Sequence, residues 1–131
     1  MSRRLPWLIA GVAAAVLAVV VLAGRARAGH PDPRPGITAE RVLPPDALPR
    51  TAGSVESYAA ARAVPQVLDG LHCYCDCARH SGHRSLLTCF ESEHGGFCDI
   101  CMGEAVLAQQ LTARGESLDA IRRAIDGQFG S

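Results

Sequence analysis

The sequence predicts a mainly α-helical fold, a small cysteine-rich domain of three to four short helices around a CxCxC loop. Helical patterns bounded by capping residues occupy most of the chain after residue 51, and no strand pattern appears outside the cysteine segment. All six cysteines lie between Cys73 and Cys101. A domain of about 80 residues buries only a thin apolar core, so we expect the cysteines to supply a covalent or metal staple.

The chain opens with a segment, residues 1–28, that is typical of membrane targeting. Two arginines precede an uncharged run over residues 5–24, which is close to the length that spans a bilayer. An ARA tripeptide at 26–28 also resembles a signal-peptidase site, so a transmembrane anchor and a cleaved signal peptide both remain open. The arginines favour an inside N-terminus. This predicts an extracytoplasmic C-terminal domain on a single span in the cell membrane, or an exported protein if the segment is cleaved.

Residues 29–50 follow this segment and hold six of the eight prolines. A proline-rich stretch of this kind does not build a core, so we expect a disordered linker with semi-rigid, partly polyproline character. His30 is then a solvated linker residue. The cysteine-rich domain is expected over residues 51–131.

The first expected helix begins near Ser54, which caps it, and is interrupted at Val64-Pro65, because the residue before proline avoids helical geometry. Pro65 suits the first turn of a short second piece that ends at Gly70. A further helix is expected over residues 84–92.

The longest expected helix covers residues 98–114 and ends at Gly115 with a left-handed cap. Its expected apolar stripe consists of Ile100, Val106, Leu107 and Leu111. Ser117 then caps a last helix. Apolar residues recur in that helix at helical spacing, namely Leu118, Ile121, Ile125 and Phe129.

Three cysteines, Cys73, Cys75 and Cys77, occupy alternate positions. In an extended backbone their sulfurs line one face, and neighbouring α-carbons on that face are about 6.6 Å apart, near the upper limit for a disulfide. They are therefore poor partners for each other. Full oxidation would instead pair each of them with one of the three later cysteines. As a multidentate clamp for a soft metal, the same array needs no rearrangement.

Cys98, Cys101 and Met102 form a second element. On a helix they share one face at its amino end, where the helix dipole and the free amides favour thiolate. A CxxC at such a place serves redox enzymes and metal sites alike. The lack of alternating strands and helices disfavours a thioredoxin-like domain, and the cysteine spacing does not fit a usual zinc finger.

Thiolates with a thioether nearby suit copper(I) best, with zinc as the alternative. Histidines close to the cysteines add candidate imidazole ligands. The candidate metal ligands are Cys73, Cys75, Cys77, Cys89, Cys98, Cys101, His72, His83, His94 and Met102.

The formal net charge is zero and the chain has no block of like charge, so no nucleic-acid partner is expected. No serine or carboxylate constellation suggests hydrolysis. The expected partners are a membrane, through the N-terminal segment, and either a soft metal ion or a redox partner protein.

Three motifs, CYCDC at 73–77, HRSLLTCF at 83–90 and HGGFCDIC at 94–101, resemble the CYCXC family, which is also described by its PCYCGC motif. The likeness covers about residues 59–129. It implies a bacterial surface or periplasmic protein whose cysteines act on soft or redox-active partners, and some members carry selenocysteine. The chain departs from the family pattern with His72 in place of proline and Asp76 in place of glycine, and no cysteine precedes the domain for lipid attachment.

Three functional hypotheses remain. In the leading one, a membrane-tethered extracytoplasmic domain binds a soft metal, most plausibly copper(I), through five thiolates, with Cys89 or a histidine completing the shell. In the second, the protein is an extracytoplasmic thiol/disulfide redox protein, and an enzyme of this kind would be a thiol oxidoreductase. In the third, all six cysteines form structural disulfides of an adaptor. The five thiolates of the first hypothesis are also the reactive groups of the second, namely Cys73, Cys75, Cys77, Cys98 and Cys101.

Overall fold

The computed structural model describes residues 29–130, and these residues form six α-helices and three short 3₁₀ helices without any strand. The mainly helical prediction is therefore confirmed for this part of the chain, with more and shorter helices than expected. The elements are η1 (Ala39–Arg41), η2 (Pro45–Ala47), α2 (Ser54–Ala63), α3 (Pro65–Asp69), α4 (Cys77–His80), α5 (Leu86–Phe90), η3 (Glu93–Phe97), α6 (Asp99–Ala113) and α7 (Leu118–Phe129).

The predicted membrane segment, residues 1–28, lies outside the described residues. Within residues 29–130, no helix has the length and apolar character needed to cross a bilayer.

Local sequence signals explain most helix ends. Pro65 begins α3, Gly115 adopts the expected left-handed conformation after α6 with a φ of 82°, and the Ser117 hydroxyl accepts a hydrogen bond from the Ala120 amide at 3.2 Å. The cap predicted at Ser54 is wrong. Its hydroxyl donates backwards to the carbonyl of Pro49 at 2.7 Å, and Gly53 takes the N-cap position.

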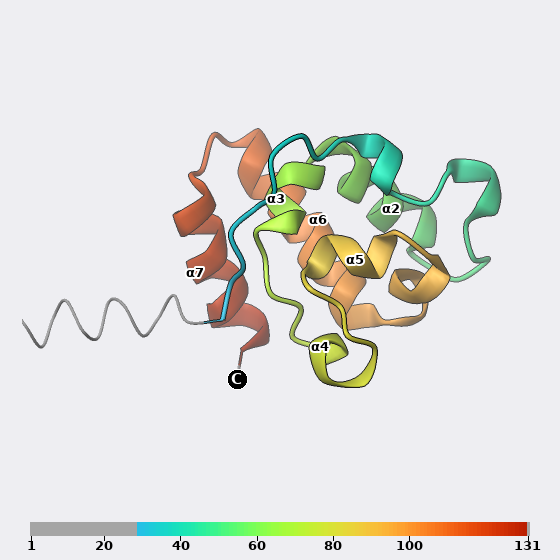
Figure 1. The fold of residues 1–131 in the computed structure, drawn as a ribbon. Coiled ribbons are helices and arrows are strands. Elements are labelled where there is room, and N and C mark those ends of the chain that lie inside the picture. The colour runs from blue at the N-terminus through green and yellow to red at the C-terminus, as the bar shows by residue number, and fades with distance from the viewer. Residues whose placement is uncertain (1–28, 131) are drawn as a thin grey trace, which may run out of the picture.

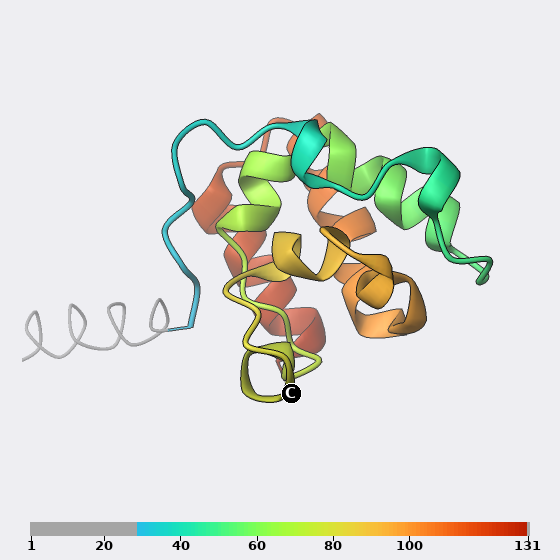
Figure 2. The same cartoon turned by 45° about the vertical axis from the view of Figure 1, so that its right-hand side comes forward.

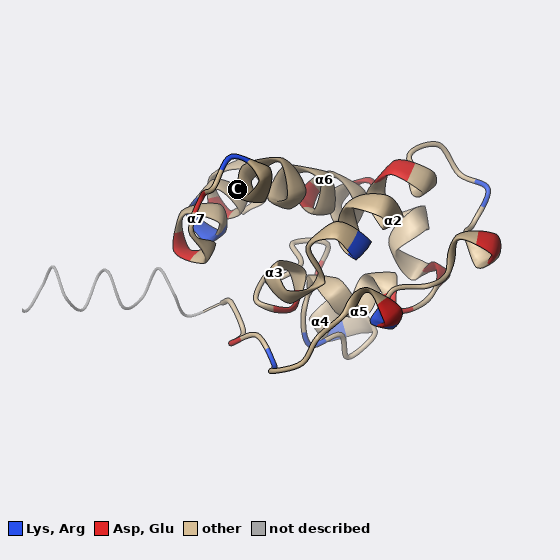
Figure 3. Cartoon of the chain, turned by 90° about the horizontal axis from the view of Figure 1, so that it is seen from above, with Lys and Arg blue, Asp and Glu red and all other residues tan. Residues whose placement is uncertain are grey.

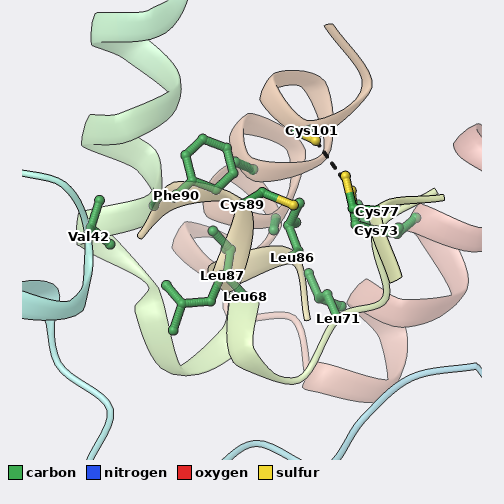
Figure 4. Packing of buried hydrophobic residues seen from close by; sticks show 14 of the residues in the cluster. Val42, Leu68, Leu71, Cys73, Cys77, Leu86, Leu87, Cys89, Phe90 and Cys101 are labelled. Carbon is green, nitrogen blue, oxygen red and sulfur yellow. Dashed lines mark hydrogen bonds between the residues drawn. The ribbon is translucent and has the colours of Figure 1, made fainter. Parts of the chain in front are cut away.

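The longest helix, α6, lies beside α2 and also contacts α7, while α5 packs against α3 and η3 (Figures 1 and 2). The buried core lies among these helices, with the Tyr58 and Phe90 rings in edge contact at 4.9 Å between centroids. Four cysteines continue this core without a break (Figure 4). They are Cys73, Cys77, Cys89 and Cys101.

The buried stripe of α6 differs from the expected one. Ile100 is 39% exposed, and Val106, Leu107 and Leu111 are only partly buried. The stripe that is buried is one position out of phase with the expected stripe and includes a carboxyl group. It consists of Cys101, Glu104, Ala105 and Ala108.

Residues 29–50, expected as a disordered linker, instead lie against the domain, and we call them the N-terminal strap. Figure 1 shows the strap in blue and cyan running past α7 and α3 toward α2. Val42 is buried, and the Leu43 amide donates to the carbonyl of Phe90 at 2.9 Å. Arg62 donates to the carbonyls of Val42 and Leu43. The prolines leave the strap extended, but side chains of the helices satisfy its carbonyl groups, so it needs no core of its own.

Figure 3 shows acidic and basic residues scattered over the molecule. No element in that view is covered by charges of one sign.

Candidate functional site

The CYCDC segment forms a tight turn and is not extended as expected. Asp76 adopts the left-handed conformation with a φ of 65°, which aspartate tolerates better than most residues, and Cys77 begins α4 directly afterwards. The turn shortens the separation of the Cys75 and Cys77 α-carbons to 5.5 Å, and the two residues form a disulfide. The prediction that neighbouring cysteines of this segment are poor partners is therefore wrong, because it assumed extended geometry.

Five sulfur atoms converge at this turn. The segment supplies Cys73, Cys75 and Cys77, α5 supplies Cys89, and α6 supplies Cys101; their Sγ atoms all lie within 4.8 Å of one another. We call this group the five-sulfur cluster. Figure 4 shows the side chains of Cys73, Cys89 and Cys101 pointing toward a common region from separate parts of the chain. These three cysteines carry free thiols.

Three of these sulfurs form a nearly equilateral triangle. The Sγ atom of Cys73 lies 3.2 Å from that of Cys75 and 3.3 Å from that of Cys101, and Cys75 and Cys101 are also 3.3 Å apart. Hydrogen bonds from the thiols of Cys101 and Cys89 lower the pKa of Cys73 to about 3. The hydrogen bonds of Cys101 with Cys73 and with Cys89 raise the pKa of Cys101, so the negative charge of the cluster is favoured on Cys73.

Two histidines border the other side of the cluster. His94 in η3 places Nε2 at 3.0 Å from the Cys77 sulfur, and His83 places Nδ1 at 3.3 Å from the Cys89 sulfur. The two rings meet edge to face at 4.7 Å between centroids. The ligand atoms of these four residues lie within 4.8 Å of one another, and we call them the Cys2His2 cluster. Burial, followed by the nearby His94, lowers the pKa of His83, which keeps its imidazole neutral.

Three predicted ligands have other surroundings, and of these Cys98 and His72 lie outside both clusters. Cys98 is the N-cap of α6 with an extended backbone, so it does not share a helical face with Cys101. The Met102 sulfur lies beside Gly53 at the start of α2, where a Cβ on that glycine would be 3.5 Å from it. His72 stacks edge to face on Tyr74, at 5.0 Å between ring centroids.

Glu104 is a residue of the site that the sequence reasoning missed. It is fully buried, its Oε1 accepts a hydrogen bond from the Tyr74 amide at 2.9 Å, and its Oε2 has no partner in the described part of the chain. Burial, with the charge of Cys73 as the next cause, raises the pKa of Glu104 to about 9. The available signal was its position three residues after Cys101 on a helix, which places both side chains on one face.

A polar network holds the turn from behind. The His72 amide donates to Nδ1 of His30, which leaves Nε2 of His30 to donate to Asp126 at 2.7 Å. Asp126 also accepts from the Tyr74 hydroxyl at 2.6 Å. The strap and α7 therefore fix the backbone that carries Cys73 and Cys75. His30 belongs to this network and is not the solvated residue expected from the sequence.

Fold and site together define a small helical, cysteine-rich domain in which thiols, imidazoles and one carboxyl group converge. The chain belongs to the family described as proteins of unknown function with a PCYCGC motif, whose family model matches residues 36–131. The family resemblance seen in the motifs is thereby confirmed. No curated protein and no solved structure matches the chain.

Proposed function

We propose that the reduced protein binds a soft metal ion, copper(I) first and zinc as the alternative, in the five-sulfur cluster. The observation that carries the proposal is the convergence of five sulfurs from the turn, α5 and α6 within 4.8 Å. A tetrahedral thiolate site with metal–sulfur bonds of about 2.3 Å has sulfur atoms about 3.8 Å apart. The measured separations, from 3.2 Å upward, accommodate such an ion with small side-chain adjustments.

The composition of the donor set favours a soft ion. Sulfur donors select copper(I) and zinc over hard cations, which prefer oxygen. The cluster is continuous with the apolar core, and such a surrounding excludes water and strengthens thiolate binding to a cation. Cys98 and Met102 are not needed for this site, because Cys89 supplies the sulfur that the sequence interpretation assigned to Cys98.

The unpartnered Glu104 oxygen gives independent support. A buried carboxyl oxygen without a partner costs about 1–3 kcal/mol. A cation held by Cys73 next to it would remove that cost and would also favour the ionised carboxylate. A bound cation would therefore satisfy a buried oxygen that the residues of the site leave without a partner.

The Cys75–Cys77 disulfide must open before both residues can serve as ligands. A dithiol reductant would supply two electrons and two protons, yielding two cysteine thiols and the oxidised reductant. The proposed location is the outer face of the cell membrane, with residues 1–28 as anchor or export signal. This part rests on the uncharged run that follows the arginines.

The test compares the two cysteines of the CDIC motif. The full chain, reduced without oxygen in detergent, is titrated with copper(I) against a competing chelator, and bound metal is counted by native mass spectrometry. Cys101→Ser should weaken copper(I) binding about tenfold or more, whereas Cys98→Ser should not change it. Equal effects of both substitutions, or no uptake by the unaltered chain, would contradict the proposal.

A second candidate function, thiol/disulfide exchange, is favoured by one specific arrangement. The Cys73 sulfur lies 3.2 Å from the disulfide sulfur of Cys75, and Cys73 is held as a thiolate. Attack of Cys73 on Cys75 would form a Cys73–Cys75 disulfide and release Cys77 as thiolate, with no net change in oxidation. Trapping with an alkylating agent and peptide mapping after a change of pH would reveal both isomers; detection of Cys75–Cys77 alone would oppose exchange.

The fully bridged adaptor is not the arrangement found. Four of the six cysteines are free, and only Cys98 among these four is not buried. Alkylation of the native oxidised chain should therefore modify Cys98 first.

A further inference from the structure

The five-sulfur cluster divides into two parts by its shortest contacts. Cys73, Cys75 and Cys101 form the triangle with edges of 3.2–3.3 Å. Cys77 and Cys89 each lie within 3.3 Å of an imidazole nitrogen, from His94 and His83 respectively. These residues therefore present two adjacent donor sets, one of sulfur alone and one of two sulfurs with two nitrogens.

We infer that the reduced protein holds two metal ions side by side, copper(I) in the sulfur triangle and a divalent ion of the zinc class in the Cys2His2 cluster. This inference rests on the proposed metal-binding function and extends it to a second site of different chemistry. The Cys75–Cys77 disulfide joins one ligand of each site, so its reduction prepares both at once.

The donor types support this assignment. Three thiolates suit copper(I), which accepts low coordination numbers and prefers sulfur. Two thiolates and two imidazoles form the tetrahedral set that zinc takes in many structural sites. The four ligand atoms of the Cys2His2 cluster lie within 4.8 Å of one another, and the rings already contact each other edge to face. Only modest side-chain rotation is required to enclose an ion.

Charge gives the second argument. Five thiolates with a single copper(I) ion would leave a net charge of −4 at a site continuous with the apolar core, which is costly away from water. A divalent ion on the histidine side reduces the net negative charge to −2. Its charge would offset those of the Cys77 and Cys89 thiolates and reduce their repulsion with the triangle. All five sulfurs remain within 4.8 Å, so Cys77 and Cys89 are also close enough to bridge the two ions.

The segment that follows α4 provides the control residue. His80 ends α4 three residues before His83, but its side chain is 74% exposed and it belongs to neither cluster. Replacement of His80 removes an imidazole from the same region without touching either proposed site.

The experiment uses the full chain, reduced without oxygen in detergent, loaded with one equivalent of copper(I) and then titrated with Zn²⁺. Native mass spectrometry should find one copper and one zinc per chain. The double variant His83→Gln, His94→Gln should keep copper and lose zinc, and His80→Gln should keep both. The reciprocal variant Cys73→Ser, Cys101→Ser should lose copper and keep zinc.

Each outcome separates the two proposals. Zinc bound equally well by the histidine double variant would overturn the second site while leaving the copper site intact. Failure of every form to bind copper would end the proposed copper site. Zinc binding that is lost in the histidine double variant would then still support the second site. Circular dichroism checks folding. If the double variant unfolds, the single variants replace it, and each should lower zinc affinity about tenfold or more, with unchanged affinity counting against the inference.

Discussion

Two buried carboxyl groups of this protein, Asp69 at the end of α3 and Glu104 within α6, have equal burial but opposite surroundings. Both are 0% exposed. Asp69 accepts hydrogen bonds from the backbone and side chain of Arg34, both at 2.7 Å, and from Ser85 at 3.1 Å. Arg84 forms an ion pair with it at 3.1 Å. One oxygen of Glu104 accepts a hydrogen bond from the Tyr74 amide, and the other has no hydrogen-bond partner among residues 29–130.

The pKa values follow these surroundings. Burial alone would raise the pKa of Asp69, but the hydrogen bonds from Arg34 and Ser85 outweigh it and hold the pKa below its usual value. Burial is not offset at Glu104, whose pKa rises to about 9. Asp69 is completed by the chain itself and stabilises the fold. Glu104 keeps one oxygen without a partner in the described part of the chain, as expected if the proposed cation site lies beside it.

The largest effect is expected at Asp69. Asp69→Asn removes the carboxylate that accepts from Arg34, Arg84 and Ser85, so the free energy of unfolding should fall by about 2 kcal/mol. Chemical denaturation of the full chain in detergent measures this change. Metal uptake by the folded fraction should remain, because Asp69 touches neither cluster. A decrease in the free energy of unfolding of less than about 1 kcal/mol would contradict the view that Asp69, unlike Glu104, stabilises the fold.

The same comparison predicts the opposite behaviour for Glu104→Gln. The amide replaces a carboxyl that is protonated at neutral pH and keeps the acceptor for the Tyr74 amide, so stability should change by less than about 1 kcal/mol. Metal affinity should fall about tenfold, because the variant cannot ionise beside a bound cation.

Thermal unfolding and copper(I) competition measure the two quantities, and the exposed Glu116→Gln serves as control. Strong destabilisation with unchanged metal affinity would show that Glu104 is a structural residue like Asp69.

Acid pH should reduce the contributions of His30 and Asp69 to the free energy of unfolding, and the contribution of His30 should fall first. Burial lowers the pKa of His30 despite the hydrogen bond that His30 donates to the negatively charged Asp126, and Arg122 and His72 lower it further. The folded state thus binds the proton less readily than the unfolded state. The His30 contribution is complete above the ordinary pKa of 6.5 and is lost as pH falls below it.

Melting temperatures at pH 7.5 and pH 5.5 should show this small loss, and His30→Gln should reduce the difference between them. An equal pH response in both proteins would contradict the assignment. The Asp69 contribution should follow only at lower pH, because its depressed pKa retains that stability until pH falls below about 3.8.

Helix positions were predictable because their signals are local. Pro65, Gly115 and Ser117 act on their own backbone or on residues within one turn, and the structure keeps all three as expected. The buried stripe of α6 was not predictable in the same way, because it consists of a cysteine, two alanines and the carboxyl group of Glu104. Apolar periodicity alone cannot indicate a face that buries a carboxyl group.

The sequence by itself determined which reactive groups this protein has, since six cysteines and their neighbouring histidines lie in one short segment whatever the fold. Only the tertiary structure decided which of them meet. The left-handed Asp76 allows Cys75 to bond to Cys77, Cys98 becomes the N-cap of α6 and lies outside both clusters, and α5 brings Cys89 into the place expected for Cys98. These outcomes depend on backbone conformation and on packing between segments distant in sequence, which residue spacing does not encode.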